Sequence, residues 1–409
     1  MPKSQSHYTT FLPLLLGINF GILFFDRNAL NFLMPFIQPE LNLTFTQVGL
    51  LSSALSLTWA GSGFIIGRLS ERTGKKKIFI VVAGVVFSLC SFVSGMAGSF
   101  LALLGARLLM GAAEGMVLPV SHAIVAMEVP AERRGMAMGI TQNLGSCFFG
   151  ALLAPILLPM FAAAFGWRGA FYIAGVPGLI LAAVIWFAVR EPKALAPAAH
   201  EDRLSIGQIM ANRNMQICTI MAILMISYLV ITMTFVPLYL TQKLGFAPQD
   251  AGWLMGVLGV SATLGSFAIP ALSDRIGRRP VMIAIPLIGL LLPAAAMFAS
   301  TKFIILAPLF FLGWGINSIF SMFMATIPSE SLPVRYVATA AGLVMGIGEI
   351  VGGVGSPFLA GWAADAFGLD AVMWILAATT LLAGIAGFGL IETRPTGANG
   401  YRSGLQATA

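Results

Sequence analysis

The sequence predicts an all-α membrane protein in which twelve transmembrane helices form two pseudo-symmetric six-helix bundles. Of its 409 residues, 58% are hydrophobic and only 10% are charged, whereas soluble domains carry about 25% charged residues. The mean hydropathy is +0.91. Charged and glycine-containing segments also recur at an offset of 203 residues. A soluble fold of this size cannot bury so much apolar surface, so lipid must solvate much of it.

The apolar runs between charged or Pro/Gly-rich breaks give the positions of the helices. A spanning helix needs roughly 20 mostly apolar residues. The first run is much longer than the core of a signal peptide, so we expect it to be a retained span. The predicted spans are residues 11–36, 46–69, 78–98, 101–127, 136–163, 169–189, 215–240, 250–273, 280–299, 303–327, 336–363 and 370–391.

One long polar stretch, from Arg190 to about Arg213, divides the chain. It predicts a bundle of residues 1–190, a cytoplasmic central loop of residues 191–214 and a second bundle of residues 215–409. Twelve spans with short connections fill about 400 residues, so no room is left for a separate soluble domain.

The basic residues predict the orientation of the chain. Of the 23 lysines and arginines, 18 lie in even-numbered connections or at the termini, three in odd-numbered connections and two within spans. Because cytoplasmic loops are enriched in Lys and Arg, we expect a multi-pass protein of the cytoplasmic (inner) membrane with both termini in the cytoplasm. The same bias accounts for the net charge of +7 without nucleic acid as a partner.

The two halves repeat each other in the same orientation. Residues 71–76 (Glu-Arg-Thr-Gly-Lys-Lys) correspond to residues 274–279 (Asp-Arg-Ile-Gly-Arg-Arg), and Pro130 corresponds to Pro333. Each repeat unit holds six predicted spans, an even number, so both units face the same way. Parallel repeats of this kind are a transporter design in which the substrate binds near the bilayer midplane between the halves.

The repeated segment resembles the signature loop of the major facilitator superfamily, Gly-x-x-x-Asp-Arg-x-Gly-Arg-Arg/Lys. Residues 67–77 carry it with Glu in place of Asp, and residues 270–279 carry it with Pro270 in place of the leading Gly. A carboxylate at a helix end can pair with an arginine on a neighbouring loop and with a helix N-terminus, which would hold the cytoplasmic side shut. The alternative is a plain positive-inside stop signal. The predicted gating residues are Glu71, Arg72, Gly74, Asp274, Arg275 and Gly277.

Two further segments resemble a narrower branch of that superfamily, the anion:cation symporters. Residues 25–30 (Phe-Asp-Arg-Asn-Ala-Leu) look like its Asp-Arg-x-x-Leu motif, and residues 107–114 look like its Arg-x-x-x-Gly-x-x-Glu pattern. The resemblance implies that Arg27 binds the substrate carboxylate and that Asp26 and Glu114 carry the proton. Arg107 would lie beside these two carboxyl groups and tune their proton affinity.

Charged groups within the spans independently indicate function. A charge at the bilayer centre costs at least about 2.5 kcal/mol, so it persists only when it is paired or lines a wet cavity. Four such residues lie in the first half and correspond to uncharged positions in the second. Charges that the scaffold alone required should recur in both halves. The four residues and their counterparts are Asp26 and Leu229, Arg27 and Val230, Arg107 and Phe310, and Glu114 and Asn317.

The spacing of these residues limits how they can pair. Arg107 and Glu114 are seven residues apart, on one helix face and about 10.5 Å apart along the axis, which is too far for a direct ion pair. Each therefore needs a partner on another helix, and Asp26 and Arg27 are the natural candidates. The alternative is a buried structural ion network without a transport role.

Glu349 departs from the resemblance, because related symporters usually carry Asn at or near this position. Its carboxyl group could accept hydrogen bonds from substrate hydroxyls or be a second protonation site, but it would repel an anion if it stayed ionised. Four other polar residues within spans are predicted to line the cavity, although packing roles are as plausible for them: Gln142, Asn143, Tyr228 and Asn317.

Together these features predict a monomeric secondary transporter, without cofactor or metal, that imports an organic carboxylate by proton symport through alternating access. The second half is rich in Phe and Met, which favours an aromatic or short monocarboxylic acid, with a sugar acid as the other option.

The alternative function is a drug/proton antiporter that exports small hydrophobic molecules. Such proteins usually carry a Gly-Pro-rich stretch in the fifth span, which residues 145–155 lack. No nucleophile elbow or phosphate loop suggests an enzyme, and Cys90, Cys147 and Cys218 are predicted to be packing residues.

Overall fold

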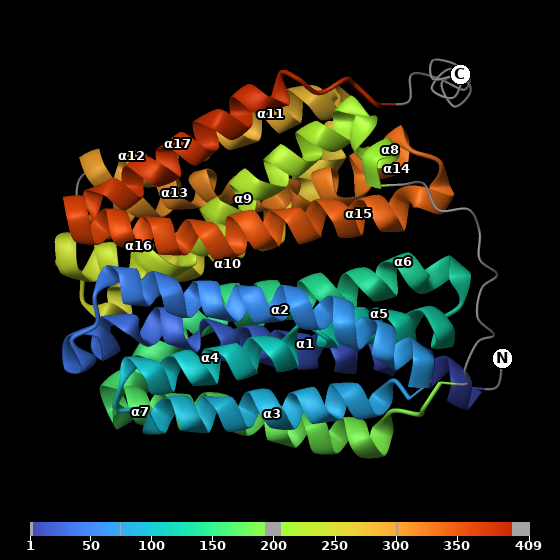
Figure 1. The fold of residues 1–409 in the computed structure, drawn as a ribbon, viewed down its shortest axis with the longest axis horizontal. Coiled ribbons are helices and arrows are strands. Elements are labelled where there is room, and N and C mark those ends of the chain that lie inside the picture. The colour runs from blue at the N-terminus through green and yellow to red at the C-terminus, as the bar shows by residue number, and fades with distance from the viewer. Residues whose placement is uncertain (1–2, 74, 193–205, 300–301, 395–409) are drawn as a thin grey trace.

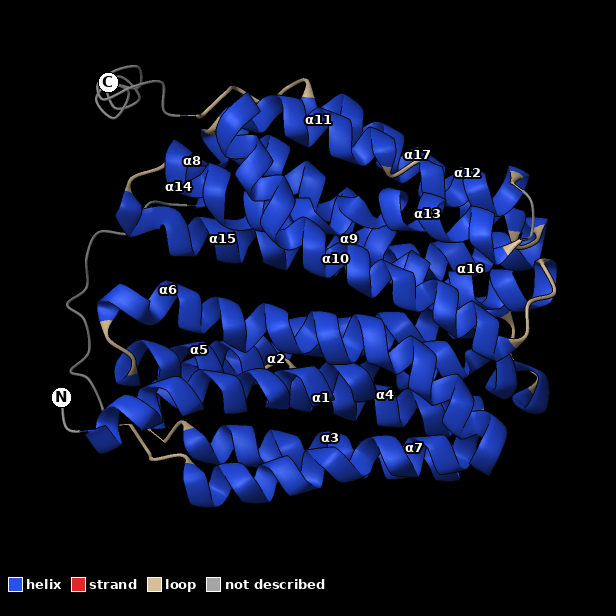
Figure 2. Cartoon of the chain, turned by 180° about the vertical axis from the view of Figure 1, so that it is seen from behind, coloured by secondary structure: helices blue, strands red, loops and turns tan. Residues whose placement is uncertain are grey.

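A computed structural model describes residues 3–73, 75–192, 206–299 and 302–394. Within these ranges every regular element is a helix (Figure 2). The prediction of an all-α membrane fold is confirmed. Most of the predicted central loop, residues 193–205, lies outside the described part.

The first half consists of long helices that follow the predicted spans. The predicted span 101–127 is divided between α4 and α5 near Gly115, and Gly166, with a φ of 71°, breaks α7 between the predicted spans 136–163 and 169–189. The helices are α1 (Lys3–Leu41), α2 (Phe45–Thr73), α3 (Lys77–Met96), α4 (Phe100–Glu114), α5 (Val117–Glu128), α6 (Ala131–Gly139) and α7 (Ala154–Ala188), with the π-helical segments η1 (Ile140–Leu144) and η2 (Ser146–Leu153) between α6 and α7.

The second half is more segmented. The predicted span 303–327 falls on α13, a 3₁₀ turn and a π-helical turn in succession. The elements are α8 (Ile206–Ala211), α9 (Arg213–Leu238), η3 (Tyr239–Lys243), α10 (Pro248–Ile276), α11 (Arg278–Ile288), α12 (Leu291–Phe298), α13 (Phe303–Gly313), η4 (Trp314–Ile319), η5 (Met322–Thr326), α14 (Ile327–Ser331), α15 (Val334–Gly348), η6 (Glu349–Gly355), α16 (Ser356–Phe367) and α17 (Asp370–Gly387).

Length and composition support membrane insertion. Among the described residues, nine helical runs are long and apolar enough to cross a membrane, and one of them, Met136–Ala188, is 53 residues long and contains two predicted spans. Large apolar side chains such as Phe187, Ile304 and Phe267 are at least 75% exposed. Exposure of this kind is expected where lipid, rather than water, covers the surface.

The helices form two layers that lie side by side (Figure 1). Helices α1 to α7 make one layer and α9 to α17 make the other. The start of α1 and the end of α17 lie at the same end of the molecule, which we call the terminal end, and the opposite end is the far end. An even number of spans in each half produces this arrangement.

The layers meet closely at the far end through two matching helix crossings. A Cβ atom at Gly49 of α2 would lie 2.1 Å from the carbonyl oxygen of Pro357 in α16, and one at Gly252 of α10 would lie 2.1 Å from that of Pro155 in α7. Gly252 follows Gly49 by 203 residues, so the repeat in sequence is also a repeat in the interface. Only glycine allows backbones to approach this closely.

The hydrogen bonds that the structure describes between the layers reinforce this contact. Asp365 of α16 accepts from the backbone N–H groups of Phe45 and Thr46, each at 2.8 Å, and so caps the N-terminus of α2 in the other layer. Asp365 also accepts from the hydroxyl of Thr46 at 2.6 Å. Further bonds join Ser52 to Thr234 (2.9 Å), Ser53 to the carbonyl of Val354 (2.6 Å) and Gln242 to Gln38 (2.7 Å). The far end is therefore closed in this conformation.

Candidate substrate and proton site

Asp26 and Arg27 are neighbours on α1 but point to different parts of the molecule. Asp26 is fully buried and accepts a hydrogen bond from the hydroxyl of Ser91 on α3. The guanidinium carbon of Arg27 lies 5.5 Å from the ring centre of Phe24 and 5.4 Å from that of Trp59 on α2. Consecutive helical residues are separated by about 100°, so one side chain enters the core of the first layer while the other faces α2.

The second pair of charges, on α4, is packed against the first. Arg107 is 2% exposed, and its Nη1 donates to the backbone carbonyl of Arg27 at 2.9 Å. Its charge interacts electrostatically with Asp26 and Glu114. Glu114 is fully buried, neither of its carboxyl oxygens has a hydrogen-bond partner, and it interacts electrostatically with Arg27. The structure thus brings together the four charged residues of the two motifs.

Glu349 approaches this cluster from the other layer. It begins η6, is 8% exposed, and its Oε2 has no hydrogen-bond partner. A methyl group at Gly353 would lie 2.6 Å from that oxygen and 3.4 Å from the hydroxyl oxygen of Ser56 on α2. The carboxyl group therefore lies at the interface between the layers, and it interacts electrostatically with Arg27.

The other predicted cavity residues are not all part of this cluster. Tyr228 is fully buried in the second layer, where its hydroxyl donates to the carbonyl of Gly289 at 3.1 Å and its ring packs on Trp314. Gln142 is partly buried in η1. The side chains of Asn143 and Asn317 lie outside the part of the chain that the structure describes.

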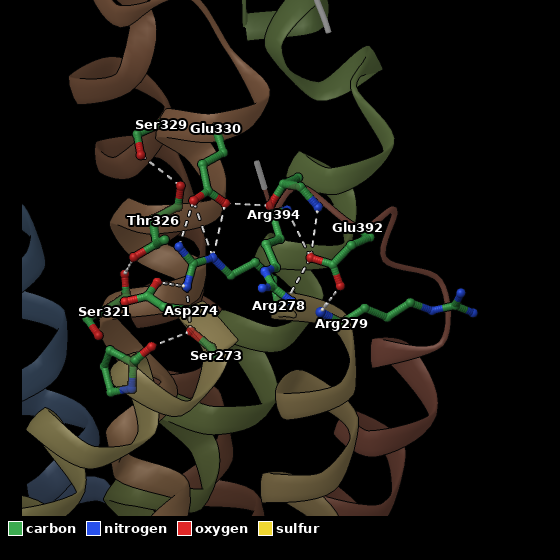
Figure 3. Close-up of polar contacts among 12 residues, drawn as sticks. Ser273, Asp274, Arg278, Arg279, Ser321, Thr326, Ser329, Glu330, Glu392 and Arg394 are labelled. Atoms are coloured by element: carbon green, nitrogen blue, oxygen red, sulfur yellow. Dashed lines mark hydrogen bonds and ion pairs between the residues drawn. The ribbon is translucent and has the colours of Figure 1, made fainter. Parts of the chain in front are cut away.

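The predicted gating loop of the second half forms a network at the terminal end (Figure 3). Arg278 donates to Asp274 and to Ser273 (2.6 Å), and it forms an ion pair of 2.8 Å with Glu330 before α15. Arg278, rather than the exposed Arg275, is therefore the arginine that joins these segments. Gly277, with a φ of 108°, permits the sharp turn between α10 and α11. In the first half, Gly74 and the side chains of Glu71 and Arg72 lie outside the described residues.

A carboxylate that the sequence analysis missed completes this network. Glu392, after α17, accepts hydrogen bonds from four backbone N–H groups, including those of Arg278 and Arg279 at the start of α11. Burial acts to raise the pKa of Glu392, but these donors outweigh it and hold the pKa below its usual value. Glu191 accepts from the backbone N–H groups of Lys76 and Lys77 at the start of α3 in the same way. Each of these glutamates is a single residue after the last span of its half, and nothing in the sequence links it to the N-terminus of a distant helix. The structure alone reveals that it caps that helix.

Among the described residues, no group of three or more His, Cys, Asp or Glu side chains is arranged to hold a metal ion. The cluster around Arg27 instead combines two guanidinium groups, Arg27 and Arg107, with the carboxyl groups of Asp26, Glu114 and Glu349. Such a set can bind an anion and exchange protons.

Known membrane transporters are similar to this chain in sequence and in fold. A sequence profile described as Major Facilitator Superfamily matches residues 16–246 and 217–406. The chain is 30% identical over 278 residues to a protein of Bacillus subtilis (strain 168) named hexuronate transporter, in an alignment that covers 64% of each chain, slightly less than two thirds of that relative. It is 27% identical over 368 residues to a probable sulfoacetate transporter, SauU, of Cupriavidus necator, covering 83% of this chain and 84% of that one.

Other relatives carry different names. The chain is 26% identical over 383 residues to the multidrug resistance protein MdtG of Dickeya zeae, covering 88% and 90% of the two chains. The fold is similar to that of a bacterial homologue of the human lysosomal transporter Spinster in an inward-facing, occupied conformation, with a TM-score of 0.79, 19% identity and coverage of 93% and 96%.

Proposed function

The chain belongs to the Major Facilitator Superfamily, and from that premise we propose that it imports an organic carboxylate by proton symport. The observation that carries the proposal is the position of Arg27. This cation lies on α1 between two aromatic rings and interacts electrostatically with carboxyl groups from both layers. A cation in this position, within a membrane-spanning helix, calls for an anionic partner.

Arg27 is suited to bind the carboxylate of the substrate. A guanidinium group is planar and can donate two parallel hydrogen bonds to a carboxylate. Arg107 is buried more deeply and donates to the backbone of Arg27, so its role is to fix the position of α1 and to balance the charges of Asp26 and Glu114.

Asp26 and Glu114 are the proposed proton carriers. An unpaired charge buried in a low-dielectric site is costly. An incoming anion adds a negative charge to the cluster, and a proton bound at Glu114 cancels it. Binding of the two together keeps the net charge of the cluster constant, which is the physical basis of coupling in this proposal.

The bias of basic residues supports a cytoplasmic location for the terminal end. The closed far end is then extracellular, and the conformation described is inward-facing. Import requires the crossings of α2 with α16 and of α10 with α7 to separate at the far end, while the two layers approach each other at the cytoplasmic end.

Relatives named for hexuronate and sulfoacetate favour a small organic acid, whereas the apolar second half favours an aromatic or short monocarboxylic acid over a sugar acid. The similarity to MdtG keeps export of small hydrophobic molecules in exchange for protons as the second candidate. Arg27, a partly buried cation within a spanning helix, distinguishes the two, because a neutral hydrophobic cargo does not need a cationic partner.

Liposomes that contain the purified protein and a pH-sensitive dye test the proposal. Glucuronate, benzoate and sulfoacetate are added outside in turn, each also in radiolabelled form. Symport acidifies the lumen while labelled anion accumulates there. If no anion acidifies the lumen, and a dye such as ethidium is instead transported in exchange for protons, the antiporter is favoured.

Two variants assign the roles within the site. Arg27→Ala is expected to abolish uptake while insertion is unchanged, and Arg133→Ala, which removes an exposed arginine, serves as the control. Wild-type uptake by Arg27→Ala would remove Arg27 from the site. Glu114→Gln is expected to block uphill accumulation but to leave exchange of labelled for unlabelled anion. Unchanged uphill uptake would exclude Glu114 as a required proton carrier.

A further inference from the structure

Glu349 and Arg27 both lie near the part of α2 that carries Ser56 and Trp59. The carboxyl group of Glu349 lies over Gly353, next to Ser56, and the guanidinium of Arg27 lies 5.4 Å from the ring of Trp59. Ser56 and Trp59 are three residues apart on α2, and side chains at this spacing are neighbours, about 5–6 Å apart. A cation of the first layer and a carboxyl group of the second thus lie near the same stretch of α2, and their charges interact.

The other carboxyl groups near Arg27 differ from Glu349 in one respect. Asp26 is turned toward Ser91 and Glu114 lies on α4, so both belong to the same layer as Arg27. Their distances from Arg27 change little when the layers move relative to each other. Asp365, the next carboxylate along the chain after Glu349, caps α2 at the far end. Glu349 is therefore the carboxyl group whose electrostatic interaction with Arg27 depends on how the two layers are arranged.

We infer that Glu349 is the counter-ion of Arg27 in the empty transporter and occupies the place that the carboxylate of the cargo takes in the loaded one. This inference rests on the proposed function of Arg27. Between its two open states a transporter closes both ends, which removes water from the interface. An unneutralised guanidinium opposes that closure. Either the cargo or Glu349 supplies the missing negative charge.

The inference explains why a carboxyl group that would repel an anionic cargo is present in the site. Glu349 is buried within the interface, and one of its oxygens has no hydrogen-bond partner there. Net import requires the empty protein to return to the outward-facing state, whereas exchange of one anion for another does not. Glu349 serves the return step.

A labelling experiment without substrate tests this directly. Ser52, at the closed interface, bonds to Thr234 across the layers. In a full-length chain with Cys90, Cys147 and Cys218 replaced by Ser, Ser52→Cys is expected to react with a membrane-impermeant maleimide from outside only when the far end opens. Right-side-out vesicles and a time course give the opening rate of the empty protein.

The expected pattern has three parts. Glu349→Gln slows labelling at least about fivefold, the lower end of typical coupling between sites, because Arg27 then lacks a negative charge from the opposite layer. Arg27→Gln slows it as well, because Glu349 is then left without its cationic partner in the opposite layer. The double variant, in which both charges are absent, recovers to within about twofold of the parent.

Two results would overturn the inference: labelling of Glu349→Gln at the parental rate, or a double variant as slow as the slower single variant. If Glu349→Gln fails to fold, the comparison of Arg27→Gln with the double variant still decides. Since the assay contains no cargo, its outcome is separate from that of the uptake assay. Absence of anion uptake by the wild type would refute the proposed function, whereas unchanged labelling would refute only the role of Glu349.

Discussion

Substitution of Gly49 by Ala should shift the transporter away from the conformation described. Gly49 lies where α2 crosses α16 at the closed far end, and its added methyl group would lie 2.1 Å from the carbonyl oxygen of Pro357. Ordinary van der Waals contact begins near 3.4 Å. The helices must therefore separate by about 1.3 Å, because the obstructing atom belongs to the backbone and cannot rotate away.

The expected magnitude follows from the cost of overpacking. Inserting a methyl group into a close-packed contact typically costs about 1–3 kcal/mol. The open far end, in which the crossing is separated, does not bear this cost. The ratio of closed to open molecules should thus fall by roughly 5- to 150-fold. The intrinsic preference of Ala over Gly in a helix, about 1 kcal/mol, acts equally in both conformations and leaves the ratio unchanged.

Distance measurements between spin labels provide the assay. Phe165 and Phe367 are exposed residues in the two layers, 67% and 73% accessible, near the far end. Labels on cysteines at these positions should show a longer distance in the Gly49→Ala protein. Gly61→Ala is the matched control, because Gly61 is on the same helix and a Cβ atom added there would meet no neighbouring atom within 4 Å. Equal distance distributions for Gly49→Ala and the parent would show that the crossing is not a closed gate.

Three further substitutions have defined outcomes. Gly252→Ala should reproduce the effect, because its Cβ would lie equally close to Pro155, and an unchanged label distance would contradict the pseudo-symmetry of the gate. Asp365→Asn removes the charged cap of α2 at Thr46 and should weaken closure by about 1 kcal/mol, seen as a smaller shift in the same measurement. Glu392→Gln should lower the melting temperature in detergent at pH 6–7. Because the pKa of Glu392 is lowered in the folded state, its contribution is present above the unfolded value near 4.5 and is lost as the pH falls through the folded pKa. The difference between wild type and variant should therefore close on acidification, and a constant difference would argue against the cap.

Much of the fold follows from hydropathy and from the repeat. Each predicted span falls on helical segments of the structure, since a chain in lipid must satisfy its backbone hydrogen bonds internally. The interruptions were not predicted. The division of α4 from α5 near Gly115, and of α13 from η4 near Gly313, occurs within continuous apolar runs, where hydropathy gives no boundary.

The site was predictable only as a set of residue types. Charges within apolar segments mark Asp26, Arg107 and Glu114 without any coordinates. Their partners depend on the rotation and depth of each helix, which the sequence does not determine. Ser91 is one of several serines on an apolar helix and has no pattern that links it to Asp26. Tyr228 was predicted to line the cavity because it is an amphipathic residue within a span. In the structure its hydroxyl instead donates a hydrogen bond within the second layer.

The close helix crossings are repeated in the two halves of the chain, whereas the charges within the spans are not. The close crossings at Gly49 and Gly252 recur at the offset of the duplication, so the movement of the layers is encoded in both halves. The charges within the spans are not duplicated, so the proposed site for the cargo lies mainly in the first half. A cation placed on one side of a moving interface needs a negative charge from the other side whenever the cargo is absent. In our proposal, Glu349 supplies that charge from the second half.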